Sequence, residues 1–364
     1  MTLLFVNSIG KKKWGGGEKW IINTAIGLQS LGHDITIGAR KNSILARKAK
    51  NAGLKILHLS YNTDFSLYSS LKLAVYLKKT KTDVVIGSLN RDVRIAGFAS
   101  RIISNGPKVI GRQGVQLIKK KWKYKFTFKN LSDGILTNSN SLKNLYDSFG
   151  WWDNNFVKVI YNGITANGSA KSTFDYSTIT SINEDTTIIL SAGRLDKQKG
   201  FRYLVLAAKY AKENHKNWKF FIAGTGRQYT YLSKLIAQHN LEDTFFFLGF
   251  KESIHPLFKR ADIFVLPSLY EGMPNVILES MLEGVPVIST PVNGAFELID
   301  DKKTGLFVPV EDPKSIYDSI EYLVQNPEKR NKIAQKAQKH IEINFNIKES
   351  VKKVNSYLEE IISK

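Results

Sequence analysis

The sequence predicts two α/β domains in tandem, each a doubly wound parallel sheet covered by helices. Three observations predict this class. Short apolar runs alternate with longer amphipathic segments through the first half of the chain, which is typical of strands joined by helical crossovers. A stretch rich in Ser, Thr, Asn and Asp then interrupts the pattern at residues 166–187. The same alternation restarts after it, and 364 residues exceed the usual size of a single core.

Seven apolar runs in the first half are expected to be strands. They are Leu3–Asn7, Asp34–Gly38, Leu54–Leu59, Asp83–Gly87, Lys108–Gly111, Gly134–Thr137 and Val157–Tyr161. Four segments between them carry apolar residues at three- and four-residue spacing, as amphipathic helices do. These predicted helices are Glu18–Leu31, Leu67–Lys79, Val93–Ile103 and Ser141–Phe149.

The second half repeats this order. Its predicted strands are Thr187–Ala192, Trp218–Ala223, Phe245–Gly249, Ile263–Pro267, Val285–Ser289 and Leu306–Val308. Its predicted helices are Phe201–Glu213, Gln228–His239, Asn275–Leu282 and Pro313–Val324, followed by a helical tail over Pro327–Lys364. We expect an N-terminal domain of residues 1–166 with the C-terminal helix (about 346–364), a linker at 167–186 and a C-terminal domain at 187–345. Ligands of such domains bind where strands end, in the cleft between them.

The composition excludes several classes of protein. The chain has no cysteine, which excludes a disulfide scaffold and a zinc site built from thiolates. There is no run of about 18 apolar residues to cross a membrane. The first residues also lack the order of a signal peptide. We therefore expect a cytoplasmic protein.

The net charge of +21 is concentrated in the first half. Residues 1–175 carry 28 Lys and Arg against 9 Asp and Glu, a net charge of +19, whereas residues 176–364 have a net charge of +2. A basic domain beside a neutral one suggests an anionic partner: a membrane, a phosphorylated glycan or a nucleic acid. The alternative is that the charge serves solubility alone.

The stretch Pro267–Pro286 carries two carboxylates, Glu271 in a loop and Glu279 in the helix that follows. If helical throughout, they would lie about 12 Å apart. Paired glycosidase carboxylates sit about 5–9.5 Å apart, so these two suit distant parts of one elongated ligand better. The helix start at Gly272–Val276 could face an anion between them. A nucleotide-sugar has that shape.

Two glycine-containing loops could meet such an anion. Gly15-Gly16-Gly17-Glu18 follows the first strand and opens a helix, although it is not the GxGxxG fingerprint and could be a flexible turn. Arg194 and Lys199 follow the first strand of the second domain, where two cations can neutralise a diphosphate leaving group. Because the chain contains no Asp-x-Asp pair, we expect no metal there.

These motifs resemble the family 4 glycosyltransferases of the GT-B fold, retaining enzymes that use nucleotide-sugar donors. The resemblance runs over nearly the whole length. It rests on Gly15–Lys19, Leu31–Ile35, Val159–Ile164, Gly193–Gly200, Ala223–Arg227, Phe247–Phe250 and the pair Glu271 and Glu279.

The resemblance implies a role for each matching residue. Glu279 would hold the ribose hydroxyls and Glu271 the transferred sugar, while Arg194 and Lys199 would hold the diphosphate. The glycines Gly15, Gly16 and Gly17 would close over it from the other domain. The remaining donor-binding residues implied in this way are Gly224, Phe250, Lys251, Ser268, Gly272, Met273, Pro274 and Asn275. We expect a UDP-linked rather than a GDP-linked sugar and no other cofactor.

One position departs from the family. Many members carry a His at the end of a first-domain strand, near the reacting carbon. Here Lys108–Gly111 is followed by Arg112 and Gln113, and none of the six His residues sits at such a strand end. We expect Arg112 or Gln113 to hydrogen-bond the donor sugar or its phosphate instead.

The segment Lys119–Lys129 interleaves lysines with aromatic residues. Its first six residues, Lys119, Lys120, Lys121, Trp122, Lys123 and Tyr124, form the expected membrane or acceptor face. Lysines and aromatics together suit the headgroup layer of an anionic membrane. The alternative is a helix whose aromatics pack inward while its lysines are solvated. We expect no nucleic-acid partner, because no RNP, KH or zinc pattern appears.

The function that the sequence predicts is transfer of a sugar, with retention, to a membrane- or lipid-linked glycan in cell-envelope polysaccharide or lipopolysaccharide assembly. The enzyme would lie at the inner face of the cell membrane. Two alternatives stay open: a GT-B nucleotide-sugar epimerase or phosphorylase, and a non-catalytic basic protein that binds membranes or nucleic acid on the same scaffold.

Overall fold

A computed structural model describes residues 1–59, 63, 66–153, 155–165 and 173–363. The chain divides into two compact units: unit 1 is Met1–Gly163 with Ile347–Lys364, and unit 2 is Ile164–Asn346. The predicted linker, residues 167–186, falls partly outside the described residues. Its described part packs on unit 2, because Tyr176 is buried and its hydroxyl donates to the Leu257 carbonyl at 2.8 Å. The structure therefore shows no separate linker over residues 173–186.

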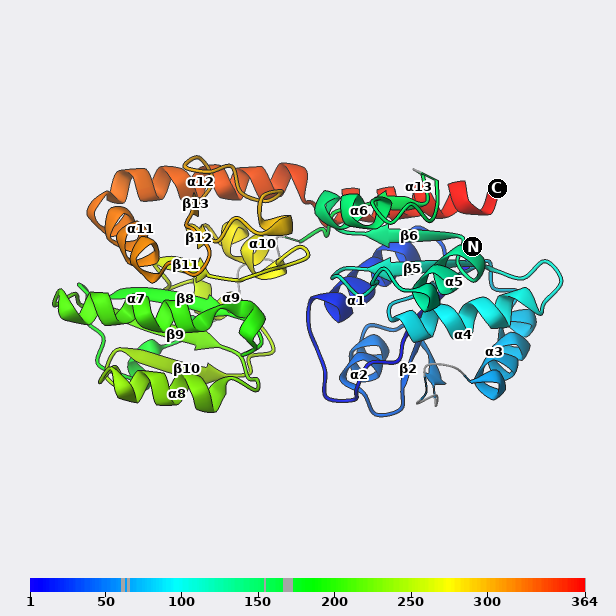
Figure 1. Ribbon diagram of the computed structural model, residues 1–364, viewed down its shortest axis with the longest axis horizontal. Coiled ribbons are helices and arrows are strands. Elements are labelled where there is room, and N and C mark those ends of the chain that lie inside the picture. Colours follow the sequence, from blue (N-terminus) through cyan, green and yellow to red (C-terminus); the bar gives the residue numbers. More distant parts are fainter. Residues whose placement is uncertain (60–62, 64–65, 154, 166–172, 364) are drawn as a thin grey trace. The chain divides into compact units, whose positions relative to one another are not determined.

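Unit 1 is a parallel sheet in the order β3-β2-β1-β4-β5-β6-β7 with helices on both faces (Figure 1). The strands are β1 (Thr2–Asn7), β2 (Asp34–Arg40), β3 (Lys55–Leu59), β4 (Val84–Gly87), β5 (Lys108–Gln113), β6 (Gly134–Thr137) and β7 (Val157–Val159). The helices are α1 (Gly16–Ser30), α2 (Ile44–Asn51), α3 (Leu67–Thr80), α4 (Asn90–Arg101), α5 (Trp122–Asn130), α6 (Asn140–Asp147) and α13 (Ile347–Ser363).

The strand order explains which helices share a face of this sheet. The chain moves from β1 to β3 in one direction and from β4 to β7 in the other. Right-handed crossovers therefore place α1 and α2 on one face and α3 to α6 on the opposite face. The two apolar clusters follow this division: side chains of α1, α2 and α13 pack with Leu3 and Phe5, and those of α3, α4 and α6 pack with Leu4 and Val6.

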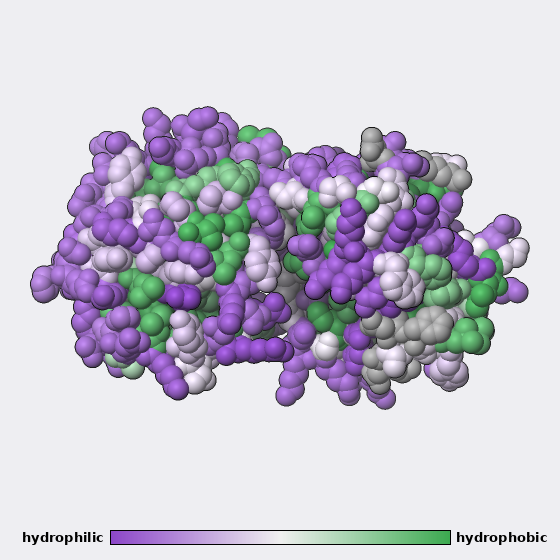
Figure 2. Space-filling view, viewed as in Figure 1, coloured by the Kyte–Doolittle hydropathy of each residue, from purple (hydrophilic) through white to green (hydrophobic). Residues whose placement is uncertain are grey.

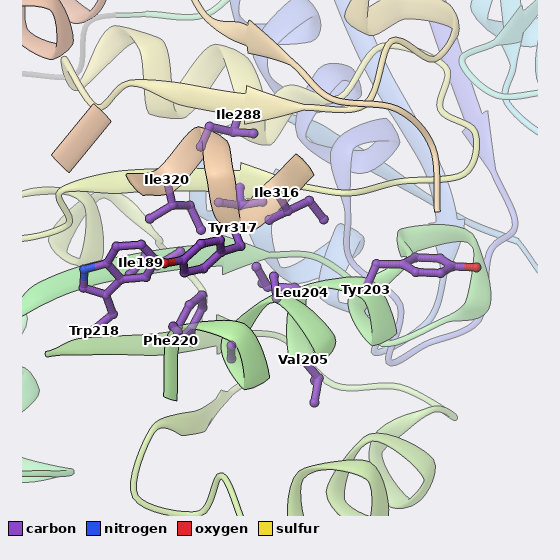
Figure 3. Close-up of a cluster of buried hydrophobic side chains, with 14 of the residues drawn as sticks. Ile189, Tyr203, Leu204, Val205, Trp218, Phe220, Ile288, Ile316, Tyr317 and Ile320 are labelled. Atoms are coloured by element: carbon purple, nitrogen blue, oxygen red, sulfur yellow. The ribbon is translucent and has the colours of Figure 1, made fainter. Parts of the chain in front are cut away.

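Unit 2 repeats the architecture with the order β10-β9-β8-β11-β12-β13. The strands are β8 (Thr187–Ala192), β9 (Trp218–Ala223), β10 (Phe245–Gly249), β11 (Ile263–Leu266), β12 (Val287–Ser289) and β13 (Leu306–Phe307). The helices are α7 (Phe201–Glu213), α8 (Tyr229–Gln238), α9 (His255–Phe258), α10 (Asn275–Leu282), α11 (Pro313–Gln325) and α12 (Pro327–Asn344). Figure 3 shows Tyr317 of α11 beside Trp218 of β9, with ring centroids 5.4 Å apart.

The fold class that the sequence predicts is confirmed. The helical tail divides into α12 and α13, because the chain leaves the helix at Phe345, whose side chain is buried, before α13 begins at Ile347. At this break the Phe345 carbonyl accepts from the Ile164 amide at 2.8 Å. The short helices α2 and α9 are additional to those expected.

Helix α13 completes the core of unit 1, although it comes from the far end of the chain. Val354 and Leu358 are fully buried in the same cluster as α1. The two helices approach closely, since a Cβ at Gly27 of α1 would lie 2.5 Å from a methyl carbon of Val351. The last helix is therefore part of the first folding unit.

We expect Leu358→Ala to lower the free energy of unfolding of unit 1 by about 2–5 kcal/mol, because the change leaves a cavity in a packed core. Urea unfolding followed by circular dichroism measures this. Lys353→Ala on the exposed side of the same helix is the matched control and should change stability by about 0.5 kcal/mol or less. Equal effects of the two substitutions would contradict the assigned role of α13.

Candidate functional site

The strand order of the unit 2 sheet reverses between β8 and β11. The chain leads from β8 to β9 and β10 on one side and from β11 to β12 and β13 on the other. Such a reversal of strand order opens a crevice that commonly binds ligands. The loops after β8 and β11 meet there: the Leu269 amide donates to the Gln198 carbonyl at 2.8 Å, and the Gln198 side chain donates to the Tyr270 carbonyl at 2.9 Å.

Glu271 follows β11 at this reversal point. Its Oε1 accepts from the Lys199 ammonium at 2.5 Å and from the Ser268 hydroxyl at 2.7 Å. The Glu271 and Lys199 side chains are only 8% and 16% exposed. An ion pair this sheltered from water is screened much less than a surface pair. Three residues of the predicted site are thus brought together, whereas the sequence had suggested separate ligand groups for Lys199 and Glu271.

Arg194, the other predicted cation, differs from Lys199. Its side chain is 64% exposed and pairs with the neighbouring Asp196. The guanidinium therefore remains accessible to a ligand in solution.

Two glycines allow the loops at the carboxyl end of this sheet to approach each other. Gly200 has φ +63°, and a Cβ there would lie 1.9 Å from the Pro267 carbonyl oxygen. Gly224 has φ +154°, and its Cβ would lie 1.9 Å from the Gly193 carbonyl oxygen. Both positions require glycine for backbone conformation and for space. The fold alone therefore explains a glycine at position 224, and the predicted contact of Gly224 with the donor is a second, separate explanation.

Helix α10 begins at Asn275, with Pro274 at the N-cap and Gly272 and Met273 buried beside it. Glu279 is buried one turn into the helix. Because Glu271–Pro274 are not helical, the 12 Å helical spacing does not apply to the two carboxylates.

The loop before α10 is fixed by three residues that were not part of the predicted site. Asn293 donates to the Glu271 carbonyl at 2.8 Å, and a Cβ at Gly294 would lie 1.9 Å from the Gly272 carbonyl oxygen. The Thr290 hydroxyl donates to the Ser268 carbonyl at 2.5 Å. Sequence reasoning missed these three residues. The sequence feature that could have identified them is their position directly after β12, the strand next to β11.

Two further predicted donor residues lie after β10. Phe250 is 54% exposed. The Lys251 ammonium lies 4.9 Å from the centre of the Phe174 ring, a cation–π contact. Neither residue contacts Glu271 or Lys199 in the hydrogen bonds and ion pairs of the described residues. Their implied role in donor binding therefore stands apart from the ion pair.

In unit 1, the predicted glycines mark the start of α1. Gly15 is the N-cap, and Gly16 and Gly17 form the first turn with exposed backbone. A Cβ at Gly17 would meet no atom within 4 Å among the described residues. The fold thus leaves open space at Gly17. The buried Glu18 accepts from the Asn7 amide at 3.0 Å, and burial raises the pKa of its carboxyl, opposed by this hydrogen bond.

Arg112 and Gln113 are the last two residues of β5 and are both buried. Arg112 donates to Asn162 Oδ1 at 2.9 Å, and its guanidinium lies 4.6 Å from the centre of the Trp20 ring. Burial lowers the pKa of Arg112 to about 10, opposed by the Glu18 carboxylate. The Gln113 amide has no hydrogen-bond partner among the described residues. Arg112 is thus structurally fixed, whereas Gln113 retains unused hydrogen-bonding capacity.

A buried carboxylate occupies the point where the strand order of unit 1 reverses, between β1 and β4. Asp92 accepts from the Ser8 hydroxyl at 2.5 Å, the Ser8 amide at 3.2 Å and the Leu89 amide at 3.0 Å. Arg91 and Arg40 donate to the Ser8 carbonyl at 2.6 and 2.8 Å. This network, which sequence reasoning missed, fixes the first residue of the loop that leads to Gly15.

The predicted membrane face lies around the start of α5. Lys119, Lys120, Lys121, Trp122 and Lys123 are exposed and Tyr124 is half-buried. Trp122 is 81% exposed, while Phe128 on the inner side of the helix is fully buried. The aromatics of this segment therefore divide between solvent and core, and the membrane interpretation stays a prediction.

Among the described residues, no group of three or more His, Asp or Glu side chains is placed to hold a metal ion. None of the helices in this part of the chain is long and apolar enough to cross a bilayer.

Two family models match the sequence. Glycosyltransferase Family 4 matches residues 14–167, and Glycosyl transferases group 1 matches residues 173–340. The chain therefore belongs to the glycosyltransferases of group 1 and family 4. The first match covers most of unit 1 and the second most of unit 2, which confirms the resemblance seen in the motifs.

Several relatives are glycosyltransferases of glycan assembly. The lipopolysaccharide core biosynthesis glycosyltransferase LpsE of Rhizobium meliloti is 25% identical over 360 residues, which is 97% of each chain. An Escherichia coli UDP-Gal:alpha-D-GlcNAc-diphosphoundecaprenol alpha-1,3-galactosyltransferase is 30% identical over 194 residues, 51% of this chain and 49% of that one. Some relatives are 31–35% identical to this chain, but the match spans only about half, or less, of each relative's own length.

A solved structure shares the whole fold. Anabaena HepE, in complex with UDP-glucose, superposes with a TM-score of 0.85 at 19% sequence identity, covering 99% of this chain and 100% of that one. This likeness establishes the GT-B fold of the chain.

The buried Asp92 predicts a pH dependence of stability. Burial raises its pKa from 3.8 to about 6, opposed by the hydrogen bonds from Ser8. Between these two values the unfolded chain loses the proton while the folded chain keeps it. The contribution of Asp92 to stability is therefore greatest below about pH 4 and falls as the pH rises to about 6, by roughly 3 kcal/mol at 1.36 kcal/mol per pKa unit.

The measurement is urea unfolding of the natural protein and of Asp92→Asn from pH 4 to 7. Because Asn does not titrate in this range, the difference in unfolding free energy between the two proteins isolates Asp92. We expect the natural protein to lose unfolding free energy relative to Asp92→Asn as the pH rises. A difference that stays constant across the range would show that Asp92 is already ionised at pH 4.

Proposed function

We propose that the protein is a retaining glycosyltransferase that moves a sugar from a nucleotide-sugar, UDP-linked rather than GDP-linked, to an acceptor. The observation that carries this proposal is the largely sheltered Lys199–Glu271 ion pair at the reversal point of the unit 2 sheet. A cation and a carboxylate held side by side can bind the two chemically different halves of a sugar diphosphate. Family membership and the nucleotide-sugar in the complex of HepE support it.

Lys199 and Arg194 would stabilise the departing diphosphate. When the bond to the sugar breaks, negative charge grows on the phosphate oxygens, and fixed cations placed there lower the barrier. Lys199 is positioned by its ion pair, while Arg194 is exposed to solvent beside its partner Asp196 and accessible to a ligand. Glu271 would accept hydrogen bonds from sugar hydroxyls, and Glu279 from those of the ribose.

The chemistry of Arg112 and Gln113 restricts the role that they can take in place of the histidine that many family members carry. With a pKa of about 10, Arg112 stays protonated at neutral pH, and a neutral amide such as Gln113 is not a base. Neither residue is suited to take the proton of an acceptor hydroxyl. We propose that both act as hydrogen-bond donors and that the leaving phosphate takes this proton on the same face of the sugar.

The proposed acceptor is a membrane- or lipid-linked glycan of the cell envelope, reached from the inner face of the cell membrane. Two relatives are named for lipopolysaccharide core synthesis and for a diphosphoundecaprenol acceptor. The net charge of +19 over residues 1–175 suits an anionic surface. The exposed Lys119–Lys123 segment supports the same partner.

We expect Arg194→Ala to lower kcat/KM for sugar transfer about 10²–10³-fold, because a cation that stabilises the leaving group is lost. Since Arg194 is mostly exposed, the melting temperature should hardly change. Arg202→Ala, on the exposed side of α7, is the matched control and should keep full activity. Near-normal turnover of Arg194→Ala would exclude Arg194 from the reaction.

Variants of the buried pair separate activity from stability. Lys199→Met leaves the Glu271 charge without its partner and should destabilise unit 2 by about 3–5 kcal/mol. The double variant Lys199→Met/Glu271→Gln removes both charges and should recover much of that stability while remaining inactive. Activity in a stable double variant would refute the catalytic assignment of the pair.

A thermal-shift panel of UDP-, GDP-, ADP- and dTDP-sugars tests the donor. A ligand at a hundred times its Kd stabilises the folded state by about 2.7 kcal/mol. We expect the largest rise in melting temperature with a UDP-sugar. A larger shift with another nucleotide would correct the base, and no shift with any of the four would contradict nucleotide-sugar binding.

A further inference from the structure

The outer face of α3 exposes a stripe of apolar side chains. Leu67, Tyr68, Leu71 and Val75 are 60%, 74%, 50% and 71% exposed. At 100° per residue, these four positions fall within one 100° arc of the helix. The opposite side of the helix, which includes Leu73 and Leu77, is buried against the sheet. Helix α3 is therefore apolar on both sides.

Single exposed apolar residues are common on soluble proteins and need no explanation. Four of them along the outer side of one helix are different, because contiguous apolar surface usually marks an interaction site. Figure 2 shows hydrophobic atoms gathered at the right-hand edge of the molecule, where Figure 1 places α3. The stripe accordingly calls for an apolar or amphipathic partner.

The charge around the stripe identifies the class of partner. Residues 66–132 contain 15 Lys and Arg, of which Arg94 and Arg112 are buried, but only two acidic residues, Asp83 and Asp92. Asp92 is fully buried, and Asp83 accepts from the Thr2 amide at 2.7 Å. On α3 itself, Lys72, Lys78 and Lys79 are exposed. The partner must therefore combine negative charge with an apolar interior.

Helix α5 adds a second exposed group of aromatics and lysines in the same helical layer. Helix α4 packs against both α3 and α5, and Phe98 of α4 contacts Phe126 of α5 with ring centroids 6.3 Å apart. Trp122 and Phe126 are 81% and 43% exposed. The combination of lysine and exposed aromatic side chains extends from α5 to α3 on one face of the sheet.

We propose that the outer face of α3 docks on an anionic lipid bilayer. Leu67, Leu71 and Val75 would enter the boundary between headgroups and acyl chains, with Tyr68 at the headgroup level. The lysine stems would lie along the apolar surface while their ammonium groups bind lipid phosphates. This surface is distinct from the Lys119–Lys123 segment, and the proposal does not depend on the sugar-transfer reaction.

The test is co-sedimentation of the full chain with vesicles. Vesicles containing phosphatidylglycerol should bind the protein, and vesicles of phosphatidylcholine alone should bind it at least about tenfold more weakly. Leu71→Gln/Val75→Gln should lower binding to the anionic vesicles about tenfold, which corresponds to about 1.4 kcal/mol. Ile343→Gln, on an exposed apolar residue of α12, is the matched control and should bind as the natural protein does.

Lysine variants separate the apolar contribution from the ionic one. Lys72→Gln/Lys79→Gln should weaken binding in low salt and have less effect in high salt, because salt screens the lysines but not the apolar stripe. Unchanged vesicle binding by the Leu71/Val75 variant would overturn the proposal. So would tighter binding to single-stranded RNA than to vesicles, lost with the lysine variant alone. Neither result depends on turnover. An inactive protein that still binds vesicles would contradict only the proposed transfer of a sugar.

Discussion

The arrangement of all strands in parallel determines where the functional groups of this protein lie. A parallel strand returns to the same sheet only through a crossover, so the carboxyl ends of the strands collect at one edge. Lys199 follows β8 and Glu271 follows β11, and the two meet because β8 and β11 are neighbours. In unit 1 the same constraint brings Ser8 after β1 to Asp92 after β4. Contacts between residues far apart in sequence are thus a direct consequence of sheet topology.

The two units use their equivalent positions differently. In unit 1 the reversal point is filled by a saturated network: Asp92 accepts three hydrogen bonds, and two arginines hold the Ser8 carbonyl. Such a network braces the loop that follows. In unit 2 the same position holds a single ion pair with an exposed arginine beside it. An ammonium group has three protons to donate and a carboxylate has two oxygens, so this pair keeps capacity for a ligand.

The parts of the fold that could be predicted are those with strong local patterns. Thr187–Ala192 and Asn275–Leu282 were placed correctly, because an apolar run that ends at a glycine or begins after a proline leaves few alternatives. Helix α2 was missed because it buries only three residues, so its periodicity is weak. Motifs singled out Lys199 and Glu271 separately, but their contact could not be predicted, because 72 residues separate the partners. No motif indicates Asp92, whose role follows from complete burial alone.

The position of α13 has a consequence for protein synthesis. The cluster around α1 needs Val354 and Leu358, which emerge from the ribosome only after all of unit 2. At about 5–20 residues per second, unit 2 takes about 10–40 s to appear. During that interval the nascent first domain has an uncovered apolar face, while the second domain has its whole sequence available before the last helix is made. The N-terminal domain is therefore the one that finishes folding last.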